Sequence, residues 1–145
     1  MKKKIYLIRH AQSEANAAID LDNPTFYYDA RLTNLGKEQT LKTRKKLANV
    51  DFDLMISSPL TRTLQTFSLV FPLPINNTIV LPLVREHLDH SCDVGRQPEI
   101  LKKEFPHFNL ATLKKFWWNN DKFIDEKAIN QESLEDLDIR VEKFK

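Results

Sequence analysis

Two side chains that could act on phosphate stand next to each other near the start of the chain, at Arg9 and His10. They follow the short apolar run from Ile5 to Ile8, and polar residues come directly after them. Arginine brings a permanent positive charge and a planar fork of donors that suits phosphate oxygens. Histidine can act as a nucleophile or a proton carrier near neutral pH. The pair therefore predicts phosphate chemistry centred on His10.

Arg62 is the second arginine that we expect at this site. It follows Ser57-Ser58-Pro59, just past the end of an expected strand over 54–57. Ligands of open α/β sheets bind beyond the carboxyl ends of the strands, so Arg62 and His10 should lie on one edge of the sheet. A bound anion explains two arginines at that edge, whereas an ordinary surface position on a helix is the alternative for Arg62.

Strands and helices alternate in the framework that must position these residues. A short apolar run that ends in a polar turn is typical of a buried parallel strand. Thr33 is a suitable N-cap for one of the helices. This alternation predicts an α/β fold with a mostly parallel sheet covered by helices. Strands are expected at 4–9, 54–57 and 78–81, and helices at about 14–19, 34–48, 60–70, 97–105, 110–118 and 133–145. The helix at 60–70 should turn its apolar residues to the core, and the helix at 133–145 has an apolar stripe; these residues are Leu60, Leu64 and Phe67, and Leu134, Leu137, Val141 and Phe144.

The composition excludes several other classes of protein. The 145 residues fit one domain, and 41% hydrophobic and 29% charged residues are ordinary for a globular protein. A formal net charge of +2 gives no argument for a nucleic-acid or membrane partner, and we expect neither. Lys2-Lys3-Lys4 is interpreted as a solvated flank, since no long apolar segment follows it. The single cysteine, Cys92, favours a reducing cytoplasm.

Four blocks of sequence, at 7–16, 29–39, 57–66 and 83–86, occur in a recognisable order. The first of them is Leu-Ile-Arg-His-Ala-Gln-Ser-Glu-Ala-Asn. Together they resemble the histidine phosphatase superfamily, the phosphoglycerate-mutase-like proteins. Ala11 stands where the family most often has glycine, which is acceptable if that position does not need a positive φ. The resemblance implies a three-layer α/β/α fold with a mostly parallel, phosphoglycerate-mutase-like sheet.

The resemblance also implies roles for particular residues. His10 would be the nucleophile that forms a phosphohistidine, with Arg9 and Arg62 binding the phosphoryl oxygens. Asn16 would donate a hydrogen bond to the phosphate, although a polar residue in the first turn of a helix needs no such role. Glu86 would be the general acid that protonates the leaving oxygen. The expected partner is a phosphorylated small-molecule substrate, and homo-oligomer formation stays open.

Other roles are open for Glu86 and for the acids near it. Glu86 could instead form a salt bridge with Arg85 or Arg96. Glu99 and Glu104 are weaker candidates for the general acid.

The residues after Glu86 allow a further hypothesis, a metal site. His87, His90 and Cys92 have the spacing His-x-x-His-x-Cys, with Asp89 and Asp93 beside them. Zinc sites usually take further ligands from a distant pair, and the chain has no second cysteine. We therefore expect no metal and no cofactor, and interpret these residues as a polar loop at the rim of the pocket.

The family's second catalytic histidine, and the central strand before it, have no counterpart in this chain. After Glu86 the only histidines are His87, His90 and His107, and none follows a strand-like run. We interpret residues 1–145 as one histidine-phosphatase-like domain that is incomplete at its C-terminus, with an irregular helical insertion around 87–130. The preferred function is a phosphomonoester hydrolase. The alternatives are a phosphoglycerate mutase and a catalytically impaired protein that binds a phosphate ligand or acts as a scaffold.

Overall fold

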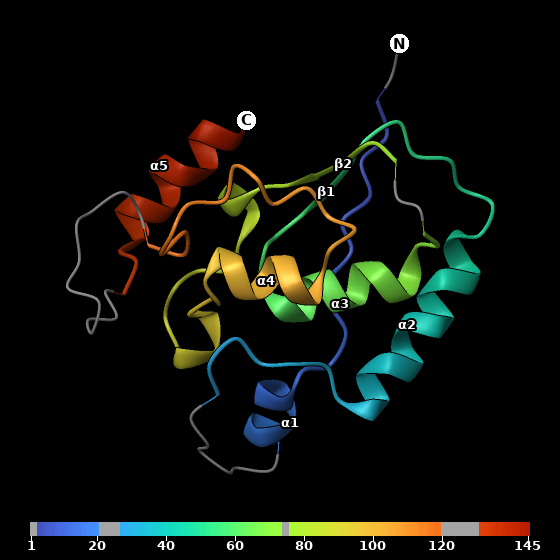
Figure 1. The fold of residues 1–145 in the computed structure, drawn as a ribbon, viewed down its shortest axis with the longest axis horizontal. Coiled ribbons are helices and arrows are strands. Elements are labelled where there is room, and N and C mark those ends of the chain that lie inside the picture. Colours follow the sequence, from blue (N-terminus) through green and yellow to red (C-terminus); the bar gives the residue numbers. More distant parts are fainter. Residues whose placement is uncertain (1–2, 21–26, 74–75, 120–130) are drawn as a thin grey trace.

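The computed structural model describes residues 3–20, 27–73, 76–119 and 131–145, which form a mixed helical and stranded fold with a parallel sheet (Figure 1). The expected short helix after His10, the helix after Thr33 and both later strands are present, each within one or two residues of its expected bounds. In chain order the elements are α1 (Glu14–Asp20), α2 (Asn34–Leu47), β1 (Met55–Ser57), α3 (Thr61–Val70), β2 (Thr78–Val80), η1 (Pro82–Val84), η2 (Ser91–Asp93), α4 (Pro98–Glu104) and α5 (Leu134–Phe144).

The two strands and the helix between them form the centre of the described structure. β1 pairs with β2 in parallel, with Ile56 opposite Ile79. A parallel pair needs a crossover connection, and α3 is that connection. The pairing continues past the strands, where the Leu81 N–H donates to the Ser57 carbonyl at 2.9 Å.

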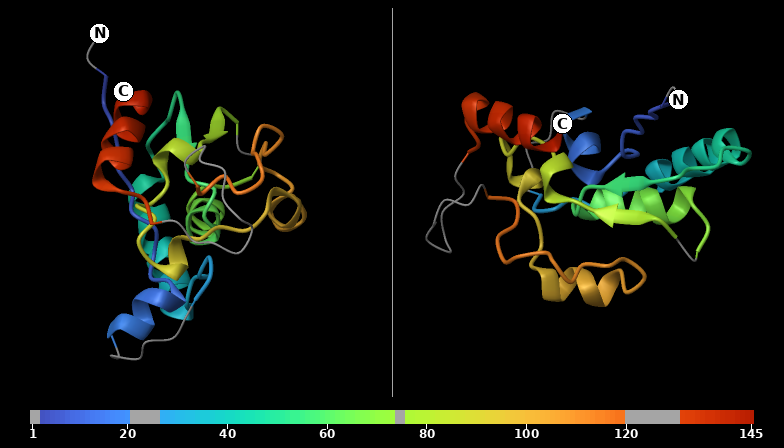
Figure 2. Two further views of the ribbon diagram at one scale, coloured as in Figure 1. Left: turned by 90° about the vertical axis from the view of Figure 1, so that its left-hand side faces the viewer. Right: turned by 90° about the horizontal axis from the view of Figure 1, so that it is seen from above.

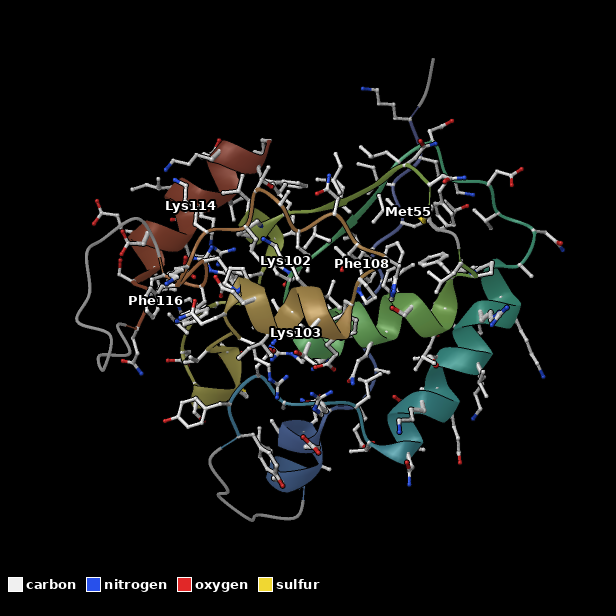
Figure 3. The ribbon with its side chains drawn as sticks, in the orientation of Figure 1. Met55, Lys102, Lys103, Phe108, Lys114 and Phe116 are labelled. Carbon is white, nitrogen blue, oxygen red and sulfur yellow. The ribbon has the colours of Figure 1, made fainter. Side chains whose placement is uncertain are left out.

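The hydrophobic core lies around α3, as expected from its apolar residues. Leu60, Leu64 and Phe67 are buried against the segment that runs from α4 to Trp118. In Figure 2, α4 lies on one side of α3, while the N-terminal segment and α5 lie on the other. Phe108 belongs to the core, and Met55 and Phe116 pack against its margin (Figure 3).

The starts of two helices are fixed by side chains. Thr33 caps α2 by accepting a hydrogen bond from the Gly36 N–H at 3.0 Å. Asp29 comes from a distant part of the chain to cap α3, because its carboxylate accepts from the N–H and the hydroxyl of Thr61 at 2.7 and 2.6 Å. Asp29 adopts a φ of 43°, a left-handed conformation that aspartate tolerates better than most residues.

Gly36 allows α2 to approach the chain close to His10. A Cβ at Gly36 would lie 2.2 Å from the Gln12 carbonyl oxygen, so only glycine fits this contact. The Thr33 N–H donates to the Gln12 carbonyl at 3.1 Å, and the Gln12 N–H donates to the side-chain oxygen of Gln39 at 2.9 Å. The polar turn after His10 is therefore anchored on the first turns of α2.

Two expected elements are wrong. Residues 4–9 do not form a strand, since no ladder partner for them exists within the described ranges, and Ile5 and Leu7 are 82% and 94% exposed. Residues 110–118 form turns rather than a helix. Phe116 has a φ of 53°, which a right-handed helix cannot contain, and the Trp117 indole N–H instead donates to the Arg96 carbonyl at 2.8 Å.

Helix α5 begins within one residue of its expected start, and its N-cap is Ser133, which accepts from the Asp136 N–H at 3.1 Å. Its apolar stripe, however, is turned largely to solvent at Leu134, Val141 and Phe144, whereas Arg140 is buried. No helix in the described part of the chain is long and apolar enough to span a membrane. The single-domain interpretation and the insertion around 87–130, part of which lies outside the described residues, stay predictions.

Candidate active site

The two ring nitrogens of His10 have different partners, and these partners define the state of the imidazole. Nδ1 lies 2.8 Å from the Ala11 carbonyl oxygen, which can only accept, so Nδ1 bears the proton. Nε2 lies 3.2 Å from Nε of Arg62, which can only donate, so Nε2 presents its lone pair. The half-buried ring is thus a neutral imidazole whose nucleophilic atom faces a guanidinium.

Helix α3 positions both sides of this contact. Arg62 lies in its first turn, and one turn later the Thr66 hydroxyl accepts a hydrogen bond from the Ala11 N–H at 3.1 Å. The same hydroxyl donates to the Arg62 carbonyl at 2.7 Å. Ala11 does not have a positive φ, so the alanine in place of the family's usual glycine is accommodated without strain.

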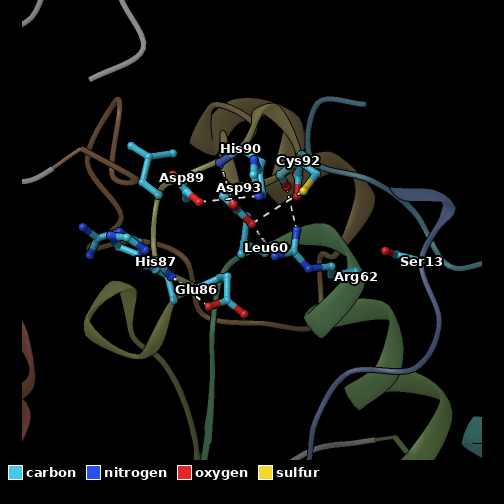
Figure 4. Close-up of polar contacts among 12 residues, drawn as sticks. Ser13, Leu60, Arg62, Glu86, His87, Asp89, His90, Cys92 and Asp93 are labelled. Atoms are coloured by element: carbon cyan, nitrogen blue, oxygen red, sulfur yellow. Dashed lines mark hydrogen bonds and ion pairs between the residues drawn. The ribbon is translucent and has the colours of Figure 1, made fainter. Parts of the chain in front are cut away.

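The Arg62 guanidinium is almost fully buried and is held at three points. Nη2 pairs with the Asp93 carboxylate at 2.9 Å, with only 4% and 5% of the two side chains exposed. Nη1 donates to the Cys92 carbonyl at 2.6 Å, and Nε faces His10. Figure 4 shows Arg62 directed from the start of α3 toward Cys92 and Asp93. A guanidinium fixed in this way cannot follow a ligand freely, so its direction is set before an anion arrives.

Electrostatics favour the neutral, nucleophilic form of His10. Burial lowers the pKa of His10 below its ordinary value, and the charges of Arg62 and Arg9 lower it further. The hydrogen bond to Ala11 and the charge of Glu86 act in the opposite direction. Because a lower pKa means less imidazolium at a given pH, the site keeps the lone pair on Nε2 available in mildly acidic solution.

Arg9 acts on His10 through its charge, whereas Asn16 is bonded to Ser13. Arg9 is exposed, and its charge reaches His10. The side-chain amide oxygen of Asn16 accepts hydrogen bonds from the Ser13 N–H and hydroxyl at 3.1 and 3.0 Å. Since the oxygen end of this amide is occupied, its NH₂ group is the part that can donate to a ligand.

Glu86 is exposed on the loop after η1, close enough for its charge to act on His10. Its Oε1 accepts from the backbone N–H of His87 at 3.0 Å, the contact drawn in Figure 4. The two alternative partners considered for Glu86 are engaged elsewhere, Arg85 with Glu132 and Arg96 with Asp29.

The other acids considered for the same role lie in different settings. Glu104 forms an ion pair with Arg31, and Glu99 is exposed on α4.

The loop after Glu86 uses its histidines in other contacts. His87 Nε2 donates to the Glu132 carbonyl at 2.6 Å, and exposed His90 lies 3.5 Å from Asp89. No group of three or more His, Cys, Asp or Glu with metal-binding geometry occurs in the described ranges. Cys92 is half-buried, and this burial raises the pKa of its thiol, which disfavours a reactive thiolate.

Three residues near this site were missed by sequence reasoning as members of its structure. Asp93 holds Arg62, and its only sequence signal was its place in the polar loop after Glu86. Glu132 and Arg140 contact the chain on both sides of Glu86. No local pattern indicates this, because their partners are about 50 residues earlier in the sequence.

The chain is similar to proteins that are named as phosphatases or as phosphoglycerate mutase-like proteins. The chain is 31% identical over 98% of its length to "Phosphoglycerate mutase-like protein 1" of Arabidopsis thaliana, of which it covers 62%. It is 28% identical over 75% of its length to a Schizosaccharomyces pombe protein named "Probable phosphatase", of which the match covers 52%. A crystal structure of an Escherichia coli protein assigned as an alpha-ribazole-5'-P phosphatase superposes with a TM-score of 0.58 at 27% identity, covering 94% of this chain and 62% of that one.

The chain thus spans between about half and three fifths of the length of these relatives. The family model of the histidine phosphatase superfamily (branch 1) matches residues 5–145, almost the whole sequence. This match covers the His10, Arg62 and Glu86 positions described above. The chain belongs to the histidine phosphatase superfamily.

Proposed function

We propose that this protein is a phosphomonoester hydrolase that works through a phosphohistidine on His10. The observation that supports this most directly is the state of the His10 ring. Nδ1–H is anchored on the Ala11 carbonyl at 2.8 Å, and the lone pair of Nε2 faces Arg62 at 3.2 Å. A nucleophilic nitrogen beside a fixed cation is what attack on a phosphate dianion requires.

In the first step, Nε2 of His10 attacks phosphorus, and the bond from phosphorus to the ester oxygen breaks. Arg62 and Arg9 interact with the phosphoryl oxygens, and the Asn16 amide donates to one of them. The leaving oxygen takes its proton from the carboxylic acid form of Glu86 and departs as an alcohol. The Nε–H of Arg62, which faces His10 in the absence of ligand, is then available to a phosphoryl oxygen.

In the second step, water attacks the phosphohistidine. The Glu86 carboxylate takes one proton from this water, the bond from phosphorus to Nε2 breaks, and inorganic phosphate leaves. His10 returns to its neutral Nδ1–H form, and Glu86 to its acid form. One phosphomonoester and one water thereby give one alcohol and one phosphate, with no metal or cofactor assigned a role.

A phosphoglycerate mutase would need further cations to hold a second phosphate group. Arg96 already donates hydrogen bonds to Asp29 and Thr61. Lys102 and Lys103 are exposed on α4 (Figure 3). We therefore favour the hydrolase. The mutase and a protein that only binds phosphate ligands are alternatives that the experiment separates.

The experiment measures phosphate release from 4-nitrophenyl phosphate, with EDTA present, for the wild type, His10→Ala and Lys42→Ala. Lys42 is exposed on α2, so its variant is the control. We expect turnover by the wild type and the control and a loss of at least about 10³-fold in His10→Ala. Isomerisation of phosphoglycerate that depends on bisphosphoglycerate would indicate the mutase instead. Phosphate binding without turnover would indicate the binding protein.

A further inference from the structure

A buried cluster of three ionic side chains is bonded to the residues that flank Glu86. The Glu132 carboxylate accepts from Nη2 of Arg85 at 3.0 Å and from Nε and Nη2 of Arg140 at 2.7 and 2.6 Å. The exposed fractions of Glu132, Arg85 and Arg140 are 1%, 4% and 5%. Burial and the neighbouring Arg140 lower the pKa of Arg85 to about 10, so Arg85 remains charged at neutral pH.

This cluster is bonded to the backbone on both sides of Glu86. On the N-terminal side, Nη1 of Arg140 donates to the carbonyls of Leu83 and Arg85, each at 2.9 Å. On the C-terminal side, the Glu132 N–H donates to the Leu88 carbonyl at 2.9 Å, and the Leu88 N–H faces the Glu132 carboxylate at 3.4 Å.

His87 connects the same cluster to the Glu86 carboxylate itself. Its ring is bonded to the Glu132 carbonyl, and its backbone N–H donates to Oε1 of Glu86. Glu86 is exposed, yet the residues before and after it are held by buried groups.

Stability alone is a weak reason for such a cluster. Buried ion pairs lose the hydration of both ions and often contribute no more than apolar residues of similar size. Four apolar residues of α5 remain exposed while its arginine is buried, namely Leu134, Ile139, Val141 and Phe144. A role in fixing geometry fits this arrangement better, because most of the cluster's bonds to the backbone end on residues 82–88. One further bond runs from Nε of Arg85 to the Trp118 carbonyl at 3.0 Å.

We propose that Glu132, together with Arg140, is a positioning residue for the general acid. The cluster fixes the backbone at 83–88 so that the Glu86 carboxyl meets the leaving oxygen of the substrate. The proposal rests on the proposed function, since it presupposes that Glu86 donates this proton. It predicts a selective loss, in which only substrates that need protonation of the leaving oxygen are slowed.

The test compares kcat/KM for an alkyl phosphate, whose leaving oxygen needs a proton, with kcat/KM for 4-nitrophenyl phosphate, whose leaving group does not. The variants are Glu132→Gln and Arg140→Lys, which keep the size of one side chain and the charge of the other. We expect the alkyl phosphate to lose about 10²-fold, the effect of misplacing a catalytic group by about 1 Å, and the aryl phosphate to lose less than about 5-fold.

Ser133→Ala is the matched control. It removes the cap of α5 but none of the bonds to residues 83–88. It should lower the midpoint of urea denaturation and leave the ratio of the two kcat/KM values unchanged. In the double variant Glu86→Gln/Glu132→Gln, kcat/KM for the alkyl phosphate divided by kcat/KM for 4-nitrophenyl phosphate should be no lower than in Glu86→Gln. The carboxyl group that Glu132 positions is already absent from both variants.

The outcomes separate the two proposals. If Glu86→Gln slows both substrates equally, the role proposed for Glu86 fails, and the role of Glu132 fails with it. If Glu86→Gln is selective but folded Glu132→Gln and Arg140→Lys slow both substrates equally, only the positioning role is overturned. If neither cluster variant unfolds cooperatively, the cluster is a structural requirement, and the positioning role is equally overturned.

Discussion

The ion pair between Arg62 and Asp93 permits a prediction with a definite sign. The two side chains meet at 2.9 Å with 4% and 5% of their surface exposed, so solvent screens them little. Charges centred about 4 Å apart attract by about 4 kcal/mol at an effective dielectric constant of about 20. Removing one partner of a buried pair costs about 3–5 kcal/mol, because the other charge stays buried without compensation. We expect Arg62→Ala to lower the free energy of unfolding by this amount.

Asp93→Asn, added to Arg62→Ala, tests whether the uncompensated charge of Asp93 causes the loss of stability. In Arg62→Ala the Asp93 carboxylate keeps, among the described residues, only the His90 N–H and a weak Cys92 thiol contact. Adding Asp93→Asn removes the uncompensated charge without changing the size of the side chain. The double variant should therefore be more stable than Arg62→Ala by about 1–3 kcal/mol, although a second buried residue has been changed.

The assay is urea denaturation followed by tryptophan fluorescence, since Trp117 and Trp118 lie in the core. Each variant is also measured with inorganic phosphate. Phosphate should stabilise the wild type and leave Arg62→Ala unaffected, because a ligand stabilises a protein only through its bound state. Arg96→Ala is the matched control, since Arg96 also pairs with a buried carboxylate, that of Asp29. It should lower stability but keep the response to phosphate.

Two results would refute this reasoning. If Asp93→Asn destabilises the Arg62→Ala protein further, uncompensated charge is not the source of the loss. If Arg62→Ala retains the full stabilisation by phosphate, Arg62 does not hold the anion.

Three further predictions follow from the same structure. Glu86→Gln should slow alkyl phosphates by about 10²–10⁴-fold and aryl phosphates far less, and an equal loss on both would indicate a structural role. The acid limb of kcat/KM should lie below pH 6.5, the ordinary pKa of histidine, because burial lowers the pKa of His10 and protonation removes its lone pair as the pH falls. Stability should likewise decline as the pH falls below 6.5, since the unfolded chain takes up this proton first; a limb above pH 6.5 would contradict the assignment. Gly36→Ala should lower stability by about 1–3 kcal/mol in urea denaturation, because its Cβ would meet the Gln12 carbonyl at 2.2 Å, whereas Lys42→Ala on the exposed face should change little.

Local signals predicted those parts of the fold that depend on local chemistry. Thr33 indicated the start of α2, because a side-chain cap satisfies backbone N–H groups within three residues, and the helix expected over 133–145 agrees with α5. The apolar spacing of Leu60, Leu64 and Phe67 likewise indicated the buried face of α3. The cap acts within three residues and the apolar spacing follows the helical period, so both signals are visible in the local sequence.

Features that depend on distant partners could not be predicted in this way. Residues 4–9 have the composition of a strand, but a strand also needs a hydrogen-bonded neighbour, and the described residues offer none at Ile5 or Leu7. The stripe on α5 suggested an apolar contact, whereas the structure buries Arg140 because Glu132 and two backbone carbonyls satisfy it.

In the candidate site, too, the local motif identified residues but not the distant partners that hold them. The motif brought His10 and Arg62 to attention, and the structure brings them into contact at 3.2 Å. Asp93, which fixes Arg62, was considered as a metal ligand and interpreted as part of the polar loop at the rim of the pocket, but not as a partner of Arg62. The roles of Arg9, Arg62, Asn16 and Glu86 stay proposals until they are tested on the protein.

The most direct test of the proposed phosphohistidine on His10 is to trap the phosphoenzyme. The protein is mixed with a ³²P-labelled phosphomonoester, quenched in base within milliseconds and digested for mass spectrometry. We expect one labelled site, on an imidazole nitrogen of His10, that is stable in base, is lost in acid and is absent from His10→Ala. Label on a serine or aspartate, or turnover that persists in His10→Ala, would contradict the central claim.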